Sequence, residues 1–177
     1  MHTIKAGEAP LINILNIHNT SYAKDGFLLS FKNGSVGIFN YSKKALEFLT
    51  QPNHSETIFD MAFKPNNKDI LATGSYDGSI KIWEINQMQC IANLYKQIQN
   101  ENVQTRNINI VYSVTWAPGD TNQIVGVSSK GEVRLWDTIK GKLLSEISPG
   151  LSQAIYWAHW STLNPTFIAV GHNDGHA

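Results

Sequence analysis

Two histidines and an aspartate close to the end of the sequence have the residue types of a metal site. His172 and His176 flank Asp174, and imidazole nitrogens and carboxylate oxygens are common metal ligands. The Asp174-Gly175 pair predicts a hairpin turn at this place, and the neighbouring sequence indicates no further ligand. We therefore predict neither a metal site nor any other cofactor.

Three other patterns could carry chemistry, and each lacks the element that would position it. Ser21 and Lys24 have the spacing of a serine-lysine pair, but that chemistry requires a helix start and companion motifs. Gly74–Gly78 precedes a predicted strand, whereas a phosphate-binding loop precedes a helix. Trp157 and Trp160 fall on opposite faces of a predicted strand, so packing explains them better than stacking on bases. The sequence predicts a protein that is not an enzyme.

Composition limits the class of protein further. Of the 177 residues, 42% are hydrophobic and 16% charged, which indicates an ordinary globular domain. The 14 basic and 14 acidic residues cancel, so no general attraction to nucleic acid or anionic membrane is expected. Cys90 is the single cysteine, which favours a reducing, intracellular setting. We predict a cytoplasmic location, with a ciliary one possible, and no membrane insertion, because no stretch is long and apolar enough to span a bilayer.

The strongest pattern is an internal repeat with a fixed spacing. A core aromatic residue is followed after 15 residues by a glycine and after 20 residues by a second aromatic residue. The repeats are Phe63, Gly78 and Trp83, then Trp116, Gly131 and Trp136, then Trp160 and Gly175, with Gly34 and Phe39 lying 44 residues before Gly78 and Trp83. Between these markers, short β-rich runs alternate with Asn-Gly and Asp-Gly turns, which predicts an antiparallel meander.

The segment His54–Glu84 resembles one WD repeat, a unit of about 40–45 residues with an early histidine and a closing Trp-Asp pair. The closing pairs here are Trp83-Glu84 and Trp136-Asp137. The resemblance implies an all-β fold, a β-propeller of four-stranded antiparallel blades around a central channel. The sequence is also similar to a large multi-propeller WD-repeat protein of animals and ciliates.

The repeat divides residues 1–177 into an incomplete propeller of about three and a half blades. We expect blades at about 20–50, 54–95, 111–147 and 154–177, with a polar, mobile insertion at 96–110. Leu11–Ile17 could be a strand that leads into the first blade or the outer strand of a preceding blade. Because a ring normally needs four to eight complete sheets, we expect these residues to be part of a larger propeller and the isolated chain to be aggregation-prone.

The WD-repeat resemblance implies a buried hydrogen-bonded network within a blade. In the second blade its members would be His54, Thr73 or Ser75, Asp77 and Trp83, since both Thr73 and Ser75 share a strand face. Indole donates, hydroxyl and neutral imidazole both donate and accept, and carboxylate accepts, so such a chain leaves no group unpaired. The other blades each lack members. The third keeps Ser128 and Trp136 but has Lys130 in the aspartate position, so its stability should depend on packing.

The family implies a non-catalytic scaffold on which other proteins assemble. The loop between the second and third strands of each blade would open on one face, where Tyr76 is a possible partner contact. Ser129 and Asn173 are its counterparts, and a merely solvated turn is the alternative. Two other functions stay open: a structural subunit of a larger coat or ciliary assembly, and an enzyme whose site lies in further blades.

Overall fold

The computed structural model describes residues 9–18, 20–50, 53–96, 108–119, 121–148 and 153–175, and every regular element in these ranges is a β-strand. The first sheet contains β1 (Leu11–His18), β2 (Asp25–Phe31), β3 (Val36–Asn40) and β4 (Ala45–Phe48). The second contains β5 (Ile58–Lys64), β6 (Asn67–Ser75), β7 (Ile80–Glu84) and β8 (Gln89–Leu94). The third contains β9 (Val111–Trp116), β10 (Gln123–Ser128), β11 (Val133–Asp137) and β12 (Lys142–Ile147). The fourth contains β13 (Ile155–Trp160) and β14 (Ile168–His172).

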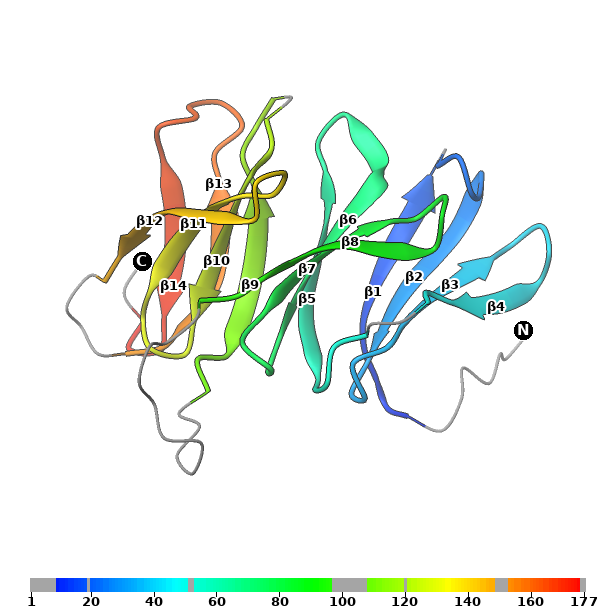
Figure 1. Cartoon of the computed structure of the whole chain (residues 1–177), viewed down its shortest axis with the longest axis horizontal. Helices are drawn as coiled ribbons and strands as arrows, with labels where there is room; N and C mark the ends of the chain where they lie inside the picture. The colour runs from blue at the N-terminus through cyan, green and yellow to red at the C-terminus, as the bar shows by residue number, and fades with distance from the viewer. Residues whose placement is uncertain are drawn as a thin grey trace.

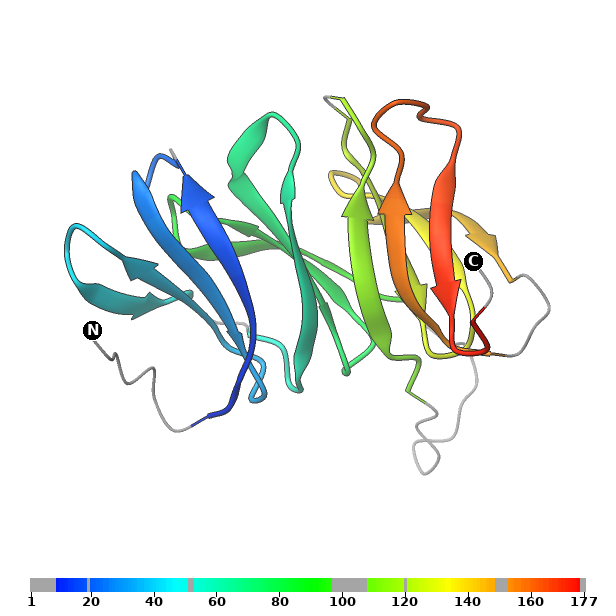
Figure 2. The same ribbon diagram turned by 180° about the vertical axis from the view of Figure 1, so that it is seen from behind.

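Each sheet is an antiparallel meander in which neighbours in sequence are neighbours in space. The four sheets stand side by side as an arc (Figure 1), with the inner strands β1, β5, β9 and β13 along one side of it (Figure 2). All four inner strands begin at the lower edge of these views. The described residues therefore form an incomplete β-propeller of three four-stranded blades and one two-stranded blade.

The first blade begins earlier than residue 20, where we expected it. Leu11–His18 pairs with β2 along its whole length and is the inner strand of that blade. Asn13 and Asn16 broke the alternation in the sequence, yet Ile17 is fully buried and anchors the strand in the core. Residues 97–107, most of the expected polar insertion, lie outside the described residues.

The core consists of apolar layers between adjacent blades. Ile17, Leu28 and Ile38 of the first blade meet Leu71 and Trp83 of the second, and all five are fully buried. Similar layers lie between the second and third blades and between the third and fourth. Burying such a side chain stabilises the fold by roughly 1.5–3 kcal/mol, so the closing tryptophans of the repeat are explained by packing.

The first blade also has an apolar face that no other described sheet covers. Phe31 and Phe39 pack there beside Leu29, and Phe31 contacts the ring of Phe48 at 5.6 Å between centroids. Phe48 is 46% exposed. A face of this kind usually marks a contact with another sheet or protein.

One backbone contact is repeated in all four blades. The turn after the second strand of each blade donates an N–H to the carbonyl of the residue just before the inner strand. The four bonds are Lys32 to Pro10 (2.9 Å), Tyr76 to Thr57 (2.8 Å), Ser129 to Ile110 (2.9 Å) and Asn173 to Ala154 (3.3 Å). The turn and the start of the inner strand are thereby fixed to each other.

Glycine is required in three of these turns for two reasons. Gly34, Gly78 and Gly131 have φ between +73° and +84°, where residues with a Cβ are strained. Each also lies against the backbone that enters the next blade. A Cβ on Gly34 would lie 2.2 Å from the carbonyl oxygen of His54, and one on Gly131 would lie 2.3 Å from that of Gln153.

A comparison of Gly131→Ala with Gly141→Ala separates these two reasons. Both glycines have positive φ, but a Cβ at Gly141 meets nothing within 4 Å. We expect Gly141→Ala to lower the free energy of unfolding by about 1–2 kcal/mol, the cost of the left-handed conformation. Gly131→Ala should cost clearly more, because the next blade must also move. Denaturant unfolding measures both, and similar losses would show that the contact between blades is unimportant.

Candidate interaction face and its supporting networks

A continuous buried hydrogen-bonded chain crosses the second blade. The indole Nε1 of Trp83 donates to Thr73 Oγ1 at 2.9 Å, and Thr73 Oγ1 lies 2.7 Å from His54 Nε2. His54 Nδ1 lies 2.9 Å from Asp77 Oδ2. The structure thus brings together four residues, one each from the loop before β5, the strand β6, the turn after it and the strand β7.

The chemistry of the groups fixes the direction of this chain. A carboxylate only accepts, so His54 Nδ1 carries the proton toward Asp77, and the bare Nε2 accepts from the Thr73 hydroxyl. Burial lowers the pKa of His54, although Asp77 opposes this effect. The lowered pKa keeps the imidazole neutral at pH 7. Burial alone would raise the pKa of Asp77, but hydrogen bonds from His54 and Ser79 hold it well below its usual range.

Of the two hydroxyl candidates on β6, only Thr73 lies in the chain. Trp83 pairs with Leu71, so its indole reaches the diagonal neighbour Thr73. Ser75 lies one pleat farther along, where its hydroxyl donates to the carbonyl of Glu56 at 3.2 Å. The sequence interpretation missed Ser79, which donates from Oγ to Asp77 Oδ1 at 2.6 Å. The signal for it was a hydroxyl two residues after the turn aspartate.

The third blade replaces this chain with ion pairs. Arg134, 7% exposed, lies 2.5 Å from Glu132 through Nη2, and its Nε donates to Glu146 at 2.9 Å. Lys96 reaches the same Glu146 at 2.7 Å. Burial opposes ionisation of Glu146, but Lys96 and Arg134 hold its pKa below the usual range. The expectation that this blade depends on packing alone was incomplete.

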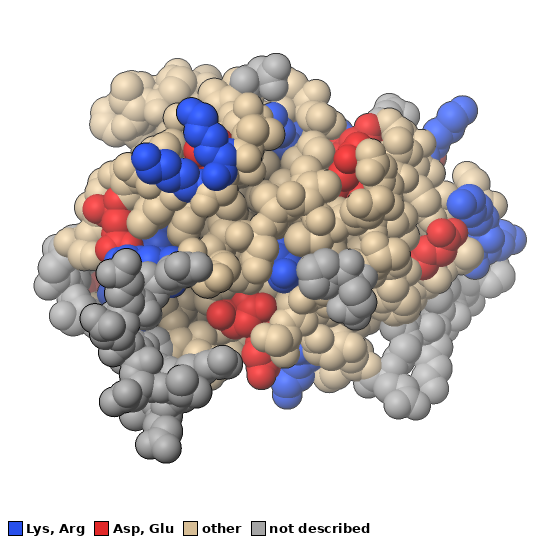
Figure 3. All heavy atoms as spheres, in the orientation of Figure 1, with Lys and Arg blue, Asp and Glu red and all other residues tan. Residues whose placement is uncertain are grey.

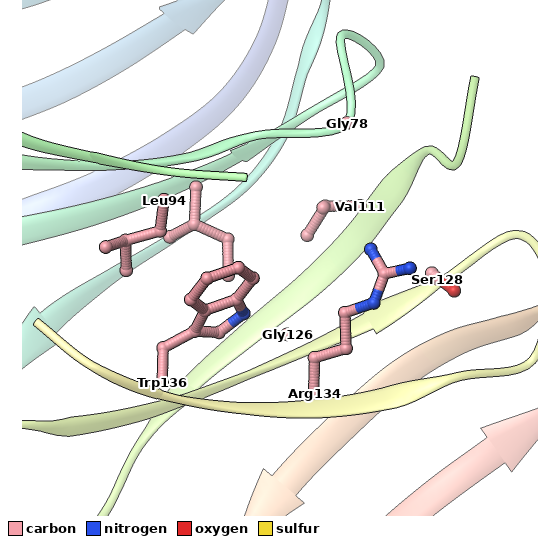
Figure 4. Close-up of a pocket in the computed structure, with 8 residues that line it drawn as sticks. Gly78, Leu94, Val111, Gly126, Ser128, Arg134 and Trp136 are labelled. Atoms are coloured by element: carbon pink, nitrogen blue, oxygen red, sulfur yellow. The ribbon is translucent and has the colours of Figure 1, made fainter. Parts of the chain in front are cut away.

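A small cavity lies between the second and third blades, beside the ion pairs. It has a volume of about 10 Å³ and is lined by Gly78, Leu94, Val111, Arg134 and Trp136, among others. Figure 4 shows the guanidinium of Arg134 and the indole of Trp136 pointing into the same space from β11. The volume suits about one water molecule, which makes the cavity a packing defect rather than a ligand site.

A β-bulge recurs at the second residue of every inner strand. The register shifts leave Ile12, Phe59, Tyr112 and Tyr156 unpaired at equivalent places. A bulge turns its side chain away from the regular pleat. All four bulged residues are large and apolar or aromatic, and they lie at the start of strands that begin at one edge of the arc (Figure 2).

Three of the bulged residues and Tyr76 form an aromatic row, defined here as Tyr76, Phe59, Tyr112 and Tyr156. Their ring centroids follow one another at 6.4, 5.2 and 4.8 Å, with the rings tilted by 43–58°. Tyr76 is 40% exposed and Tyr156 is 50% exposed. Sequence reasoning singled out Tyr76 and missed the other three, although an aromatic residue four positions before Phe63, Trp116 and Trp160 was a visible signal.

The structure places the other two expected contact residues at turns equivalent to that of Tyr76. Ser129 is half-buried, and its hydroxyl accepts from the N–H of Ile110 at 3.1 Å. Asn173 is exposed. Both share with Tyr76 the repeated backbone bond to the start of the inner strand.

The rest of the described surface offers little for other chemistry. Lysines, arginines and acidic residues are mixed across the face seen in Figure 3, with no large area of one sign. Among the described residues, no three His, Cys, Asp or Glu side chains are placed to hold a metal, and His176 lies outside those residues. No helix in the described part of the chain could cross a membrane.

Comparison with protein families agrees with the repeat. The family model "WD domain, G-beta repeat" matches residues 47–84, the segment that contains the buried chain of the second blade. Residues 47–84 form a WD repeat of this family. The WD-repeat markers in this chain, the turn glycines and closing tryptophans, are the residues that the fold uses between blades.

Several WD-repeat relatives are similar over part of their length. The human peroxisomal targeting signal 2 receptor is 28% identical over 77% of this chain and 39% of its own length. The 78 kDa intermediate chain of flagellar outer-arm dynein from Chlamydomonas reinhardtii is 30% identical over 55% of this chain and 15% of its own. Rat coronin-7 is 30% identical over 55% of this chain and 9% of its own. The chain thus spans well under half of the length of these relatives.

The buried histidine predicts a dependence of stability on pH. The pKa of His54 is lower in the folded state than its value of about 6.5 in an unfolded chain. The unfolded state therefore binds more protons as the pH falls below about 6.5, and the free energy of unfolding should fall by up to about 1.4 kcal/mol per pH unit. Asp77, whose pKa is also lowered, adds a further loss only below about pH 4.

Thermal melts between pH 7.5 and 5.5 test this dependence. His54→Gln should be less stable and should lose most of the slope, whereas His159→Gln, an exposed histidine on β13, should keep it. An unchanged slope in His54→Gln would assign the dependence to another group.

The two turn residues at the aspartate position of the second and third blades should differ in importance. Asp77→Ala removes the acceptor of His54 and Ser79, and each buried donor left unpaired costs ~1–3 kcal/mol. Lys130→Ala should cost under ~0.5 kcal/mol, as is usual for a site without buried partners. Chemical denaturation gives both values, and equal losses would contradict the importance of the buried chain.

Proposed function

We propose that this chain is a non-catalytic scaffold that binds other proteins through the aromatic row and the turns beside it. The row carries the proposal, because large aromatic side chains are enriched at the centres of protein interfaces. Four neighbouring rings from two blades and the start of a third form one surface. Tyr76 is the first ring of this surface, and Ser129 and Asn173 would border it as further partner contacts.

The geometry of the His54–Asp77 pair supports a non-catalytic function. The His54 side chain has 0% exposure, and both of its nitrogens already have partners in the buried chain. It can therefore neither reach a substrate nor exchange a proton with one. The pair serves stability.

A structural subunit of a larger assembly is the second candidate, and one observation favours it. A relative over 55% of this chain is named as an intermediate chain of the flagellar outer dynein arm. A subunit of this kind would co-purify with its partners in fixed stoichiometry, whereas an adaptor would not. The names of the relatives also support an intracellular location, and a ciliary one would follow from this second candidate.

Site-specific photo-cross-linking tests the proposed face. Benzoylphenylalanine is placed at Ser129 or Asn173 in the tagged chain, expressed in cells of its source, and cross-linked proteins are identified by mass spectrometry. We expect capture at both positions. Tyr112→Ala in the same chain should reduce it about tenfold, because it removes the centre of the row.

The control position is Tyr41, an exposed tyrosine in the turn between β3 and β4 of the first blade, which contributes no residue to the row. Benzoylphenylalanine at Tyr41 should capture none of the same proteins. Equal capture at Tyr41, or capture that is insensitive to Tyr112→Ala, would show that the row is not the binding face.

A further inference from the structure

We infer that the aromatic row recognises a proline-rich segment in the polyproline II conformation. This inference rests on the proposed function and adds the chemistry of the partner. Three features of the row lead to it: the spacing of its rings, the absence of a charged side chain among its four members and its three phenolic hydroxyls.

The spacing of the rings suits an extended ligand. Each ring contacts the next, from Tyr76 to Phe59, Tyr112 and Tyr156, and the last three rings come from the successive inner strands β5, β9 and β13. Neighbouring rings are tilted by 43–58°, so each presents its face or edge in a different direction. Polyproline II rises about 3.1 Å per residue, so three ring-to-ring steps of 4.8–6.4 Å match a segment of about five or six residues.

The electrostatic surroundings suit an uncharged ligand. Burial raises the pKa of Tyr112, and the next contributions come from the phenols of Tyr156 and Tyr76. The two carboxylates that adjoin the row in sequence are already occupied. Asp60 accepts from Ser113 Oγ at 2.7 Å and Val114 N at 2.9 Å, and Asp77 belongs to the buried chain.

Both carboxylates already accept hydrogen bonds from the protein, so their oxygens are less available to pair with a cationic ligand. A proline-rich segment presents flat apolar rings and carbonyl groups that have no internal hydrogen bonds. Tyrosine meets both needs, since its ring provides a flat contact and its hydroxyl donates to a carbonyl. Surfaces lined by aromatic side chains are the usual receptors of such segments.

Fluorescence anisotropy of a labelled octaproline peptide with the 177-residue chain tests the inference. The matched control peptide has alanine at alternate positions. We expect the octaproline to bind at least tenfold more tightly than the control. Tyr112→Ala should weaken binding at least tenfold, Tyr112→Phe two- to fivefold because only the hydroxyl is lost, and Tyr41→Ala less than twofold.

Peptides of two other ligand classes are measured in the same assay. Tighter binding of a trimethyllysine peptide or of an amphipathic helical peptide than of octaproline would overturn the inference. So would equal binding of octaproline and its alanine control, or binding that survives Tyr112→Ala. Circular dichroism of each variant checks that it is folded. Tyr112 is only half-buried, so its replacement should leave the blades intact.

The cross-linking experiment tests the scaffold function independently of the polyproline ligand. If capture at Ser129 and Asn173 depends on Tyr112 while octaproline does not bind, the scaffold function stands and the polyproline assignment is wrong. If neither result is obtained, both the scaffold function through this face and its polyproline ligand are rejected.

Discussion

The contact between each turn and the start of an inner strand is the constraint on which the rest of the arc depends. An inner strand has a sheet partner on one side only, so its position must be fixed from elsewhere. The repeated N–H to carbonyl bond does this in all four blades. In three of them the turn glycine also touches the backbone that enters the next blade. The contact therefore sets both the geometry within a blade and the packing of one blade on the next.

Given this constraint, the blades differ in how they satisfy their buried polar groups. The second uses neutral groups that end in one carboxylate, with His54 fully enclosed. The third uses Arg134 between Glu132 and Glu146, with Lys96 at the partly exposed end. Buried ion pairs repay their desolvation only with good geometry and additional hydrogen bonds. The second blade, whose chain needs one charge, is the better candidate for the most stable unit.

The sequence predicted the repeated blade pattern and missed side-chain pairings that occur in one blade only. The spacing of glycine and aromatic residues located the blades because the turn and the inter-blade layer need the same residue types each time. The choice between Thr73 and Ser75 could not be made, since it depends on the register of β6 against β7. The pairing of Arg134 with Glu146 depends on β11 and β12 being registered, and no repeat marks it. β1 was ambiguous because its two asparagines interrupt an apolar pattern.

The buried chain and the aromatic row are physically connected. Tyr76 immediately precedes Asp77, whose carboxylate is held by His54 and Ser79. The N–H of Tyr76 donates to Thr57, two residues before Phe59. The same chain that fills the second blade thus fixes the backbone on both sides of the first ring contact. A surface whose rings are already in place loses less conformational freedom when it binds. The residues that mark the repeat in the sequence therefore serve binding indirectly, by holding rings that the repeat pattern does not include.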